Sequence, residues 1–271
     1  MLRSSRPLSA AVMGYGTVPS SPQDVKKETF WSMLTLVFCP LFTIASFIFW
    51  VTIVDLVLYI PLVAVDFDSH QFLAPTSQGL DWFGAKDGFA MQQQWQLWRW
   101  VTPLFLHASL VHLLYNILMQ MIIGFRLEPA IGWAVTALIY ILSGIGGVLF
   151  SALVSPNSLS VGASTAIFGI TSALVALIIF AWDDLPGGMG KVMTLVWVVM
   201  LLVLNLVAGV GAEHVDVWGH LGGLVVGFLL GGLLFTQVKW LQWAFGGALV
   251  LYFVGGFVLF YTVIDTSELE F

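Results

Sequence analysis

One serine and one histidine, on separate apolar segments, are the residues of this sequence that could carry out catalysis together. Ser164 lies in the run SVGASTAIFG, and His220 lies in the run WGHLGGLVVG. A serine hydroxyl becomes a nucleophile when a histidine within hydrogen-bonding distance accepts its proton. Each residue also has a plainer interpretation. A membrane serine usually bonds back to its own helix carbonyl, and the histidine could be neutral and structural.

His112 and Asn116 form a second candidate group. They are four residues apart in LVHLLYNIL, so both side chains lie on one face of a predicted helix. Two polar donors on an otherwise apolar face require a polar partner. That partner is either a neighbouring helix, to which they would hydrogen-bond, or the oxyanion that forms during acyl transfer.

The spacing gives less support to other kinds of chemistry. Two histidines can bind a metal, but no carboxylate or cysteine completes a ligand set at a fitting spacing, so we expect no metal and no cofactor. Asp216 precedes His220 by one helical turn. This position on the same helix favours a helix cap over the third member of a catalytic triad.

The composition indicates what kind of structure must position these residues. Of 271 residues, 59% are hydrophobic and 9% are charged, whereas a soluble domain carries about 25% charged residues. The composition therefore excludes a water-soluble globule and predicts an integral membrane protein. Nine Lys and Arg against 15 Asp and Glu argue against a nucleic-acid partner. The single Cys39 excludes an intramolecular disulfide.

Seven apolar segments are long enough to cross a bilayer as helices, which takes about 20 residues each. They lie near 31–65, 101–124, 130–153, 162–182, 191–211, 217–237 and 241–263. We therefore predict an all-α polytopic helical bundle. Its parts are a disordered cytoplasmic tail at 1–29, a six-span core at 30–237 with a large outer loop at 66–100, a seventh span at 238–263 and a short outer tail at 264–271.

The positive charges predict an orientation in the membrane. With seven crossings, seven cations fall on the side of the N-terminus and two on the other side. The first group comprises Arg3, Arg6, Lys26, Lys27, Arg126, Lys191 and Lys239, and the second comprises Lys86 and Arg99. The N-terminus is therefore predicted to be cytoplasmic and the C-terminus lumenal or extracellular. The four candidate residues named above then fall at similar depth near the outer side.

Two stretches of small residues are candidates for helix packing. In the sixth segment a glycine recurs at every fourth position, which permits close approach of two helix backbones. These glycines are Gly219, Gly223, Gly227 and Gly231. His220 lies beside this stripe, where it can reach a neighbouring helix. The second stretch, with Gly246, Gly247, Gly255 and Gly256, is a candidate packing face within the chain or between chains.

Four motifs between about residues 95 and 235 resemble, in the same order, those of the rhomboid intramembrane serine proteases. They are Trp98-Arg99, His107-Ala108-Ser109-Leu110-Val111-His112 with Asn116, Gly162-Ala163-Ser164, and Gly219-His220-Leu221-Gly222-Gly223. Arg126 and Glu128 are similar to the family's Arg-x-Glu pair after the second span.

This resemblance implies a role for each residue of the candidate site. Ser164 would be the nucleophile and His220 its general base, as a dyad without an acid. The oxyanion hole would consist of the Ser164 backbone N–H, His112 and Asn116. Gly162 would support this arrangement, and Phe168 would pack on the catalytic histidine.

The resemblance also implies a substrate class, namely single-span membrane proteins cleaved in or near their transmembrane segment. Helices that contain glycine or unwind easily near the outer interface should be preferred, because unwinding exposes backbone groups at high cost in lipid.

Four tryptophans of the predicted outer loop at 66–100 fit contact with the bilayer surface, because tryptophan rings suit the headgroup layer. These are Trp82, Trp95, Trp98 and Trp100.

Two departures from the commonest family pattern bear on these expectations. Thr165 stands where glycine usually follows the serine, which could alter substrate access near the nucleophile. The seventh span follows the core, as in secretase-type members. This order favours the plasma membrane or a secretory-pathway membrane over the mitochondrial inner membrane.

Two other functions are considered. A non-catalytic rhomboid-like protein could bind membrane clients, although such relatives usually lack the serine or the histidine, and both are present here. A polytopic transporter would need polar residues along a pathway. Asp55 is the only acidic residue deep in a span, and we expect it to pack against a polar neighbour.

Overall fold

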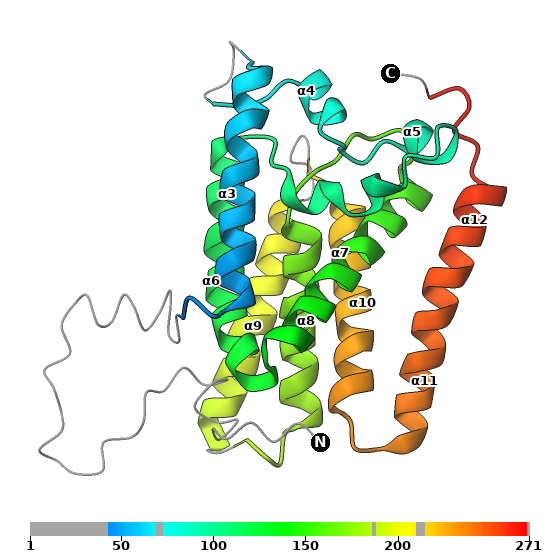
Figure 1. Cartoon of the computed structure of the whole chain (residues 1–271). Coiled ribbons are helices and arrows are strands. Elements are labelled where there is room, and N and C mark those ends of the chain that lie inside the picture. The colour runs from blue at the N-terminus through cyan, green and yellow to red at the C-terminus, as the bar shows by residue number, and fades with distance from the viewer. Residues whose placement is uncertain (1–42, 69–72, 186–187, 210–214, 270–271) are drawn as a thin grey trace, which may run out of the picture.

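The structure, a computed structural model, describes residues 43–68, 73–185, 188–209 and 215–269. Within these ranges the chain forms a bundle of seven long apolar helices and no extended strand (Figure 1). They are α3 (Phe47–Val65), α6 (Leu110–Ile131), α7 (Trp133–Val154), α8 (Ser164–Phe180), α9 (Gly188–Gly209), α10 (Val217–Phe235), and a last helix composed of α11 (Lys239–Val250), η4 (Leu251–Gly255) and α12 (Gly256–Thr262). This confirms the predicted all-α polytopic bundle with a seventh helix at its C-terminal end. The predicted tail at 1–29 and the start of the first span lie outside the described residues.

The predicted start and end of the second span, 101–124, are wrong, whereas α7 lies within three residues of the predicted third span at 130–153. Residues 97–105 form two short 3-10 turns, η2 (Leu97–Trp100) and η3 (Thr102–Phe105), instead of the start of a membrane helix. The helix begins only after Ser109, whose hydroxyl accepts the His112 N–H at 3.1 Å as an N-cap. It then continues to Ile131. Arg126 and Glu128 therefore lie in its last turns and do not follow it.

Helix α8 lies at the centre of the bundle, in contact with α6, α7, α9 and α10 (Figure 1). It has 17 residues and is the shortest of the apolar helices, whereas the other six are each long enough to cross a membrane. At 1.5 Å per residue it is about 26 Å long, less than the roughly 30 Å of a hydrocarbon core. The segment 155–163 must therefore reach into the bundle to meet its first residue, Ser164.

Glycines of α10 pack directly on α8, as the stripe predicts. A Cβ atom on Gly223 would lie 2.0 Å from the carbonyl oxygen of Thr165, and one on Gly227 would lie 2.1 Å from that of Gly169. Neither position has room for a side chain. This close approach fixes the relative position of the helices that carry the serine and the histidine.

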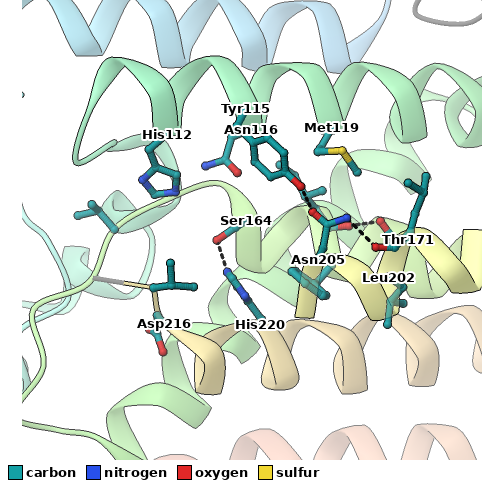
Figure 2. A pocket seen from close by; sticks show the side chains of 15 residues that line it. His112, Tyr115, Asn116, Met119, Ser164, Thr171, Leu202, Asn205, Asp216 and His220 are labelled. Atoms are coloured by element: carbon teal, nitrogen blue, oxygen red, sulfur yellow. Dashed lines mark hydrogen bonds between the residues drawn. The ribbon is translucent and has the colours of Figure 1, made fainter. Parts of the chain in front are cut away.

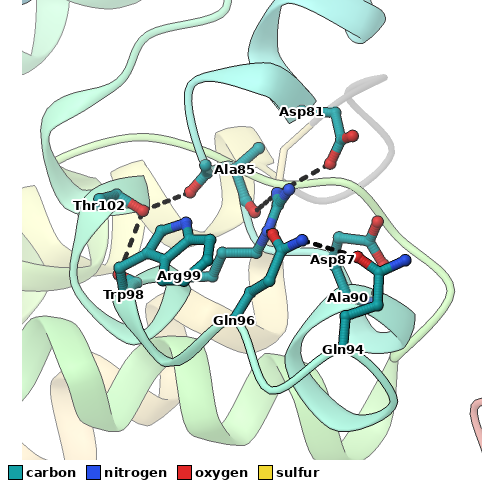
Figure 3. Close-up of polar contacts among 10 residues, drawn as sticks. Asp81, Ala85, Asp87, Ala90, Gln94, Gln96, Trp98, Arg99 and Thr102 are labelled. Atoms are coloured by element: carbon teal, nitrogen blue, oxygen red, sulfur yellow. Dashed lines mark hydrogen bonds and ion pairs between the residues drawn. The ribbon is translucent and has the colours of Figure 1, made fainter.

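The segment between α3 and α6 covers one end of the bundle (Figure 1). It contains α4 (Ser77–Trp82), α5 (Gly88–Gln92) and both 3-10 turns. Buried Arg99 holds it together: its guanidinium donates to the Ala85 carbonyl at 2.7 Å and to the Gln96 side chain at 2.6 Å, and it pairs with Asp81 at 2.8 Å (Figure 3).

The tryptophans of this segment have different surroundings. Trp82, Trp95 and Trp98 are more than half exposed, which suits the predicted contact with headgroups. Trp100 is only 6% exposed and packs edge-on against Phe257 and Phe260 of the last helix. The prediction of a headgroup contact is therefore wrong for Trp100, which instead joins the loop to the seventh helix.

Asp55 of α3 is fully buried and accepts a hydrogen bond from Gln120 of α6 at 3.1 Å. Gln120 also donates to Thr52 and accepts from the Tyr140 hydroxyl at 3.0 Å. This agrees with the expectation of a polar neighbour for Asp55. At the N-terminal end of α3, the Glu128 carboxylate accepts hydrogen bonds from the backbone N–H groups of Phe47 and Ile48 and so caps the helix.

Candidate active site

Ser164 and His220 are brought together by the starts of two helices. Ser164 is the first residue of α8, and His220 lies in the first turn of α10. The Asp216 carboxylate caps α10 by accepting the Gly219 N–H at 2.8 Å. The Nε2 atom of His220 lies 2.7 Å from the Ser164 Oγ atom (Figure 2). This is a hydrogen bond of the length that proton transfer requires.

The orientation of the His220 ring is set by an aromatic neighbour. Phe168, one turn after Ser164, stacks on the imidazole with ring centroids 4.4 Å apart and 18° between the planes. The Nδ1 atom of His220 is buried and has no hydrogen-bond partner among the described residues. Asp216 instead bonds Ser160 Oγ at 2.7 Å, in addition to its capping bond. Asp216 is therefore a cap, as its position in the sequence suggests.

His112 and Asn116 face the turn that precedes Ser164. Gly162 in that turn has φ of +136°, in a region that favours glycine. A Cβ atom there would lie 2.8 Å from His112 Cε1 and 3.5 Å from Asn116 Nδ2. The Asn116 Nδ2 atom is buried and unpartnered within the described part of the chain. A buried donor without a partner is costly in a stable fold, and this one is free to bind a ligand.

The Ser164–His220 pair opens onto a cavity of about 170 Å³ between α6, α8, α9 and α10 (Figure 2). All four predicted side chains line it, and its remaining wall is mostly apolar. Two polar residues of its lining, Tyr115 of α6 and Asn205 of α9, were not predicted from the sequence. The Tyr115 hydroxyl donates a hydrogen bond to the Asn205 side chain. They are 90 positions apart, and no local pattern relates them.

Thr165 does not line this cavity. It is 6% exposed and packs between α7 and α10: a Cβ on Gly147 would lie 2.7 Å from the Thr165 Cβ, and a Cβ on Gly219 3.0 Å from its methyl group. The expectation that Thr165 changes access at the nucleophile is therefore not supported. Its side chain instead fills a contact between helices.

His107 lies just before α6, fully buried, with its ring 5.4 Å from that of His112. Burial, followed by the neighbouring His112, lowers the pKa of His107 to about 3. His107 is therefore neutral at neutral pH and adds no positive charge beside the candidate oxyanion site.

Sequence comparison identifies the protein family. The family model of the Rhomboid domain matches residues 94–237, more than half of the chain and all of the residues just described. This chain belongs to the rhomboid family. Among curated rhomboids, it is 34% identical over 215 residues to Rhomboid-like protease 1 of Toxoplasma gondii, covering 78% of this chain and 72% of that protein.

Two further rhomboids are similarly related. Rhomboid-like protease 3 of Toxoplasma gondii is 36% identical over 68% of this chain and 67% of its own length. RHOMBOID-like protein 6, mitochondrial, of Arabidopsis thaliana is 37% identical over 62% of this chain and 53% of its own length. The chain thus spans about half the length of this plant relative.

Proposed function

We propose that this rhomboid is an intramembrane serine endopeptidase that works through a Ser164–His220 dyad. The observation that carries the proposal is the 2.7 Å bond between Ser164 Oγ and His220 Nε2 at the wall of a cavity. A nucleophile in contact with its base, beside a buried donor that has no partner among the described residues, is the arrangement that acyl transfer needs. The relatives named as proteases support the same reaction.

The reaction proceeds in two halves. Ser164 Oγ attacks the carbonyl carbon of the scissile peptide while its proton passes to His220 Nε2. His220 then gives that proton to the leaving amine nitrogen, and an acyl-enzyme ester remains on Ser164. In the second half a water molecule transfers a proton to His220 Nε2 and attacks the ester carbonyl. The bond between that carbon and Ser164 Oγ then breaks, which releases the new carboxyl end, and His220 returns its proton to Ser164 Oγ.

Three donors stabilise the negative oxygen of each tetrahedral intermediate. They are the backbone N–H of Ser164, the His112 ring and the Asn116 amide, and Gly162 keeps the space between them open. Because Asn116 Nδ2 has no partner within the described residues, no existing bond must be broken before it donates. Such preorganised donors are commonly the largest single contribution to catalysis.

The substrates we propose are single-span membrane proteins, cleaved in or near the membrane segment, with no cofactor. The apolar lining of the cavity, including Met119, Ile167 and Leu201, suits side chains from a membrane helix. The segment to be cleaved must leave its helix before its carbonyl can reach Ser164. Weak or glycine-containing helices are therefore the preferred substrates.

We also propose the domain limits and orientation predicted from the sequence: a catalytic core at 30–237, followed by the seventh span and short tail. The ends of α6 and the starts of α9 and α11, which carry Arg126, Lys191 and Lys239, lie at the end of the bundle opposite the Lys86–Arg99 loop (Figure 1). The positive-inside rule then favours a cytoplasmic N-terminus and an outer active site. The plasma membrane or a secretory-pathway membrane is the proposed location.

The test is cleavage of a fluorogenic single-span substrate by purified protein in detergent. Ser164→Ala should abolish cleavage, while the matched control Ser172→Ala should retain it. Ser172 lies two turns further along α8, and within the described part of the chain its hydroxyl bonds only its own helix, at the Gly169 carbonyl. Cleavage by Ser164→Ala at the wild-type rate would contradict the proposed dyad.

A further inference from the structure

Lys86 is a fully buried lysine outside the site described above. It lies between α4 and α5, with 0% of its surface exposed. Its ammonium group donates to three oxygens: Ser151 Oγ at 3.0 Å, the Ser155 carbonyl at 2.7 Å and Ser158 Oγ at 2.7 Å. All three belong to the end of α7 or to the segment that follows it. A buried charge with three matched acceptors is costly to assemble, which indicates a specific role.

The backbone of Lys86 holds the same segment. Its N–H donates to the Ser160 carbonyl at 2.9 Å, and its carbonyl accepts the Ser160 N–H at 3.3 Å. The Ser160 hydroxyl then bonds Asp216, the cap of the helix that carries His220. Lys86 therefore holds residues 155–160 at both the side-chain and the backbone level. It connects them to the start of α10.

This segment leads directly to the nucleophile. Ser160 is four residues before Ser164, and between them the Gly162 N–H donates to the Pro103 carbonyl at 2.8 Å. The turn at Gly162 faces His112 and Asn116. A shift of residues 155–160 would move the Ser164 backbone N–H relative to those two donors. Displacements of about 1 Å can reduce a rate by two orders of magnitude.

The charge of Lys86 strengthens this connection. Charge-assisted hydrogen bonds are roughly twice as strong as neutral ones. Burial lowers the pKa of Lys86 to about 8, while the carboxylates of Asp216 and Asp87 oppose that shift. The guanidinium of Arg99, a cation of the same loop, donates to the Ala85 carbonyl and pairs with Asp81 (Figure 3). The remaining contacts from α7 and from residues 155–160 are uncharged hydroxyls and carbonyls.

We propose that Lys86 is a positioning residue for the peptidase reaction. Its ammonium group holds residues 155–160, and through them the Ser164 backbone, in the geometry that oxyanion binding requires. Catalysis therefore depends on the positive charge of Lys86. This inference rests on the proposed function, because it concerns the rate of that reaction.

The experiment compares the pH dependence of kcat and of unfolding in the full-length wild type and in Lys86→Met, which keeps the chain length but has no donor. Wild-type kcat should fall as the pH rises through about 8. Lys86→Met should be slower by roughly ten- to hundredfold at pH 7, with KM nearly unchanged and without that alkaline decline. The matched control is Lys239→Met, at the start of α11, which should behave as wild type.

As the pH rises above about 8, the stability of the wild type should change in the opposite direction to its activity. The folded-state pKa of Lys86 lies below its ordinary value of 10.5, so the unfolded chain binds the proton more tightly. Stability should therefore rise from about pH 8 to pH 10.5 in the wild type, and this rise should be smaller in Lys86→Met. A merely structural lysine would lower stability and activity together when replaced.

The outcomes separate this proposal from the one on which it rests. A wild-type kcat that stays flat from pH 7 to 9.5, or a Lys86→Met variant with the wild-type kcat, would overturn the role of Lys86 while leaving the peptidase intact. The wild-type pH profile decides the question even if Lys86→Met does not fold. Absence of any cleavage by the wild type, together with failure of a fluorophosphonate to label Ser164, would instead overturn the proposed function.

Discussion

Phe168 and His220 lie face to face, with ring centroids 4.4 Å apart and an angle of 18° between the ring planes. Phe168 is one turn after Ser164 on α8, so a single helix supplies both the proposed nucleophile and the surface against which the proposed base packs. The imidazole has no hydrogen-bond partner at Nδ1 among the described residues. In the proposed dyad, stacking therefore takes the orienting role that a carboxylate has in a catalytic triad.

Phe168→Leu should reduce kcat because the His220 ring loses its stacking partner. Aromatic pairs contribute about 0.5–1.5 kcal/mol beyond burial, which corresponds to roughly a two- to tenfold loss of rate. The measurement is steady-state cleavage in detergent. Phe180→Leu is the matched control, since Phe180 lies on the same helix and packs on Phe245 away from the dyad. Equal kcat values for both variants would contradict an orienting role.

Asn116→Ala should slow turnover without unfolding the protein. Losing one oxyanion donor costs about 2.7–4 kcal/mol of transition-state stabilisation, or a factor of about 10² to 10³ in kcat. The Asn116 Nδ2 atom has no partner in the described residues, so its removal breaks no bond there. The kcat and the thermal unfolding midpoint should be measured together. An unchanged kcat would make Asn116 a structural residue only.

Gly223→Ala should destabilise the bundle, because the new Cβ would lie 2.0 Å from the Thr165 carbonyl oxygen of α8. Overpacking a close contact typically costs about 1–3 kcal/mol. Gly247→Ala is the matched control, since a Cβ there meets nothing within 4 Å. The thermal unfolding midpoint should fall for the first variant and hold for the second. Equal midpoints would mean that α8 and α10 are packed less closely than described.

Gln92→Leu should loosen the C-terminal end of the seventh helix. The buried Gln92 amide donates to the carbonyls of Phe260 and Ile264 and accepts from the Thr266 hydroxyl at 2.6 Å. Leaving buried carbonyls unpaired costs about 1–3 kcal/mol. Limited proteolysis near residue 264 should become faster. The matched control is Gln94→Leu, because Gln94 is exposed, and this variant should be cleaved at the wild-type rate. Equal cleavage rates for the two variants would contradict the proposed contact of Gln92 with the end of the seventh helix.

The four candidate side chains that line the cavity could be singled out from the sequence because each belongs to a short pattern of its own. The spacing of His112 and Asn116 places both on one helix face, and the glycines of α10 need only their period to predict close packing. The limits of the second span were harder to predict, because residues 101–109 are largely apolar yet do not form an α-helix. Pro103 and the Ser109 cap were the available signals.

The role of Lys86 could not be predicted from the sequence. Its three acceptors come 65 to 72 positions later in the chain, so only the folded structure brings them together. The same holds for the contact between Tyr115 and Asn205 across the cavity. A lone lysine in an outer loop is compatible with a solvated side chain, and no local periodicity distinguishes the two possibilities.

The most direct test of the proposed dyad is labelling with a serine-directed fluorophosphonate, followed by mass spectrometry of the modified peptide. The hydroxyl that His220 contacts at 2.7 Å should be the only serine modified. The account predicts a single adduct on Ser164 that is lost in Ser164→Ala and strongly reduced in His220→Ala. Labelling at another serine, or labelling of Ser164 that is equally fast without His220, would contradict it.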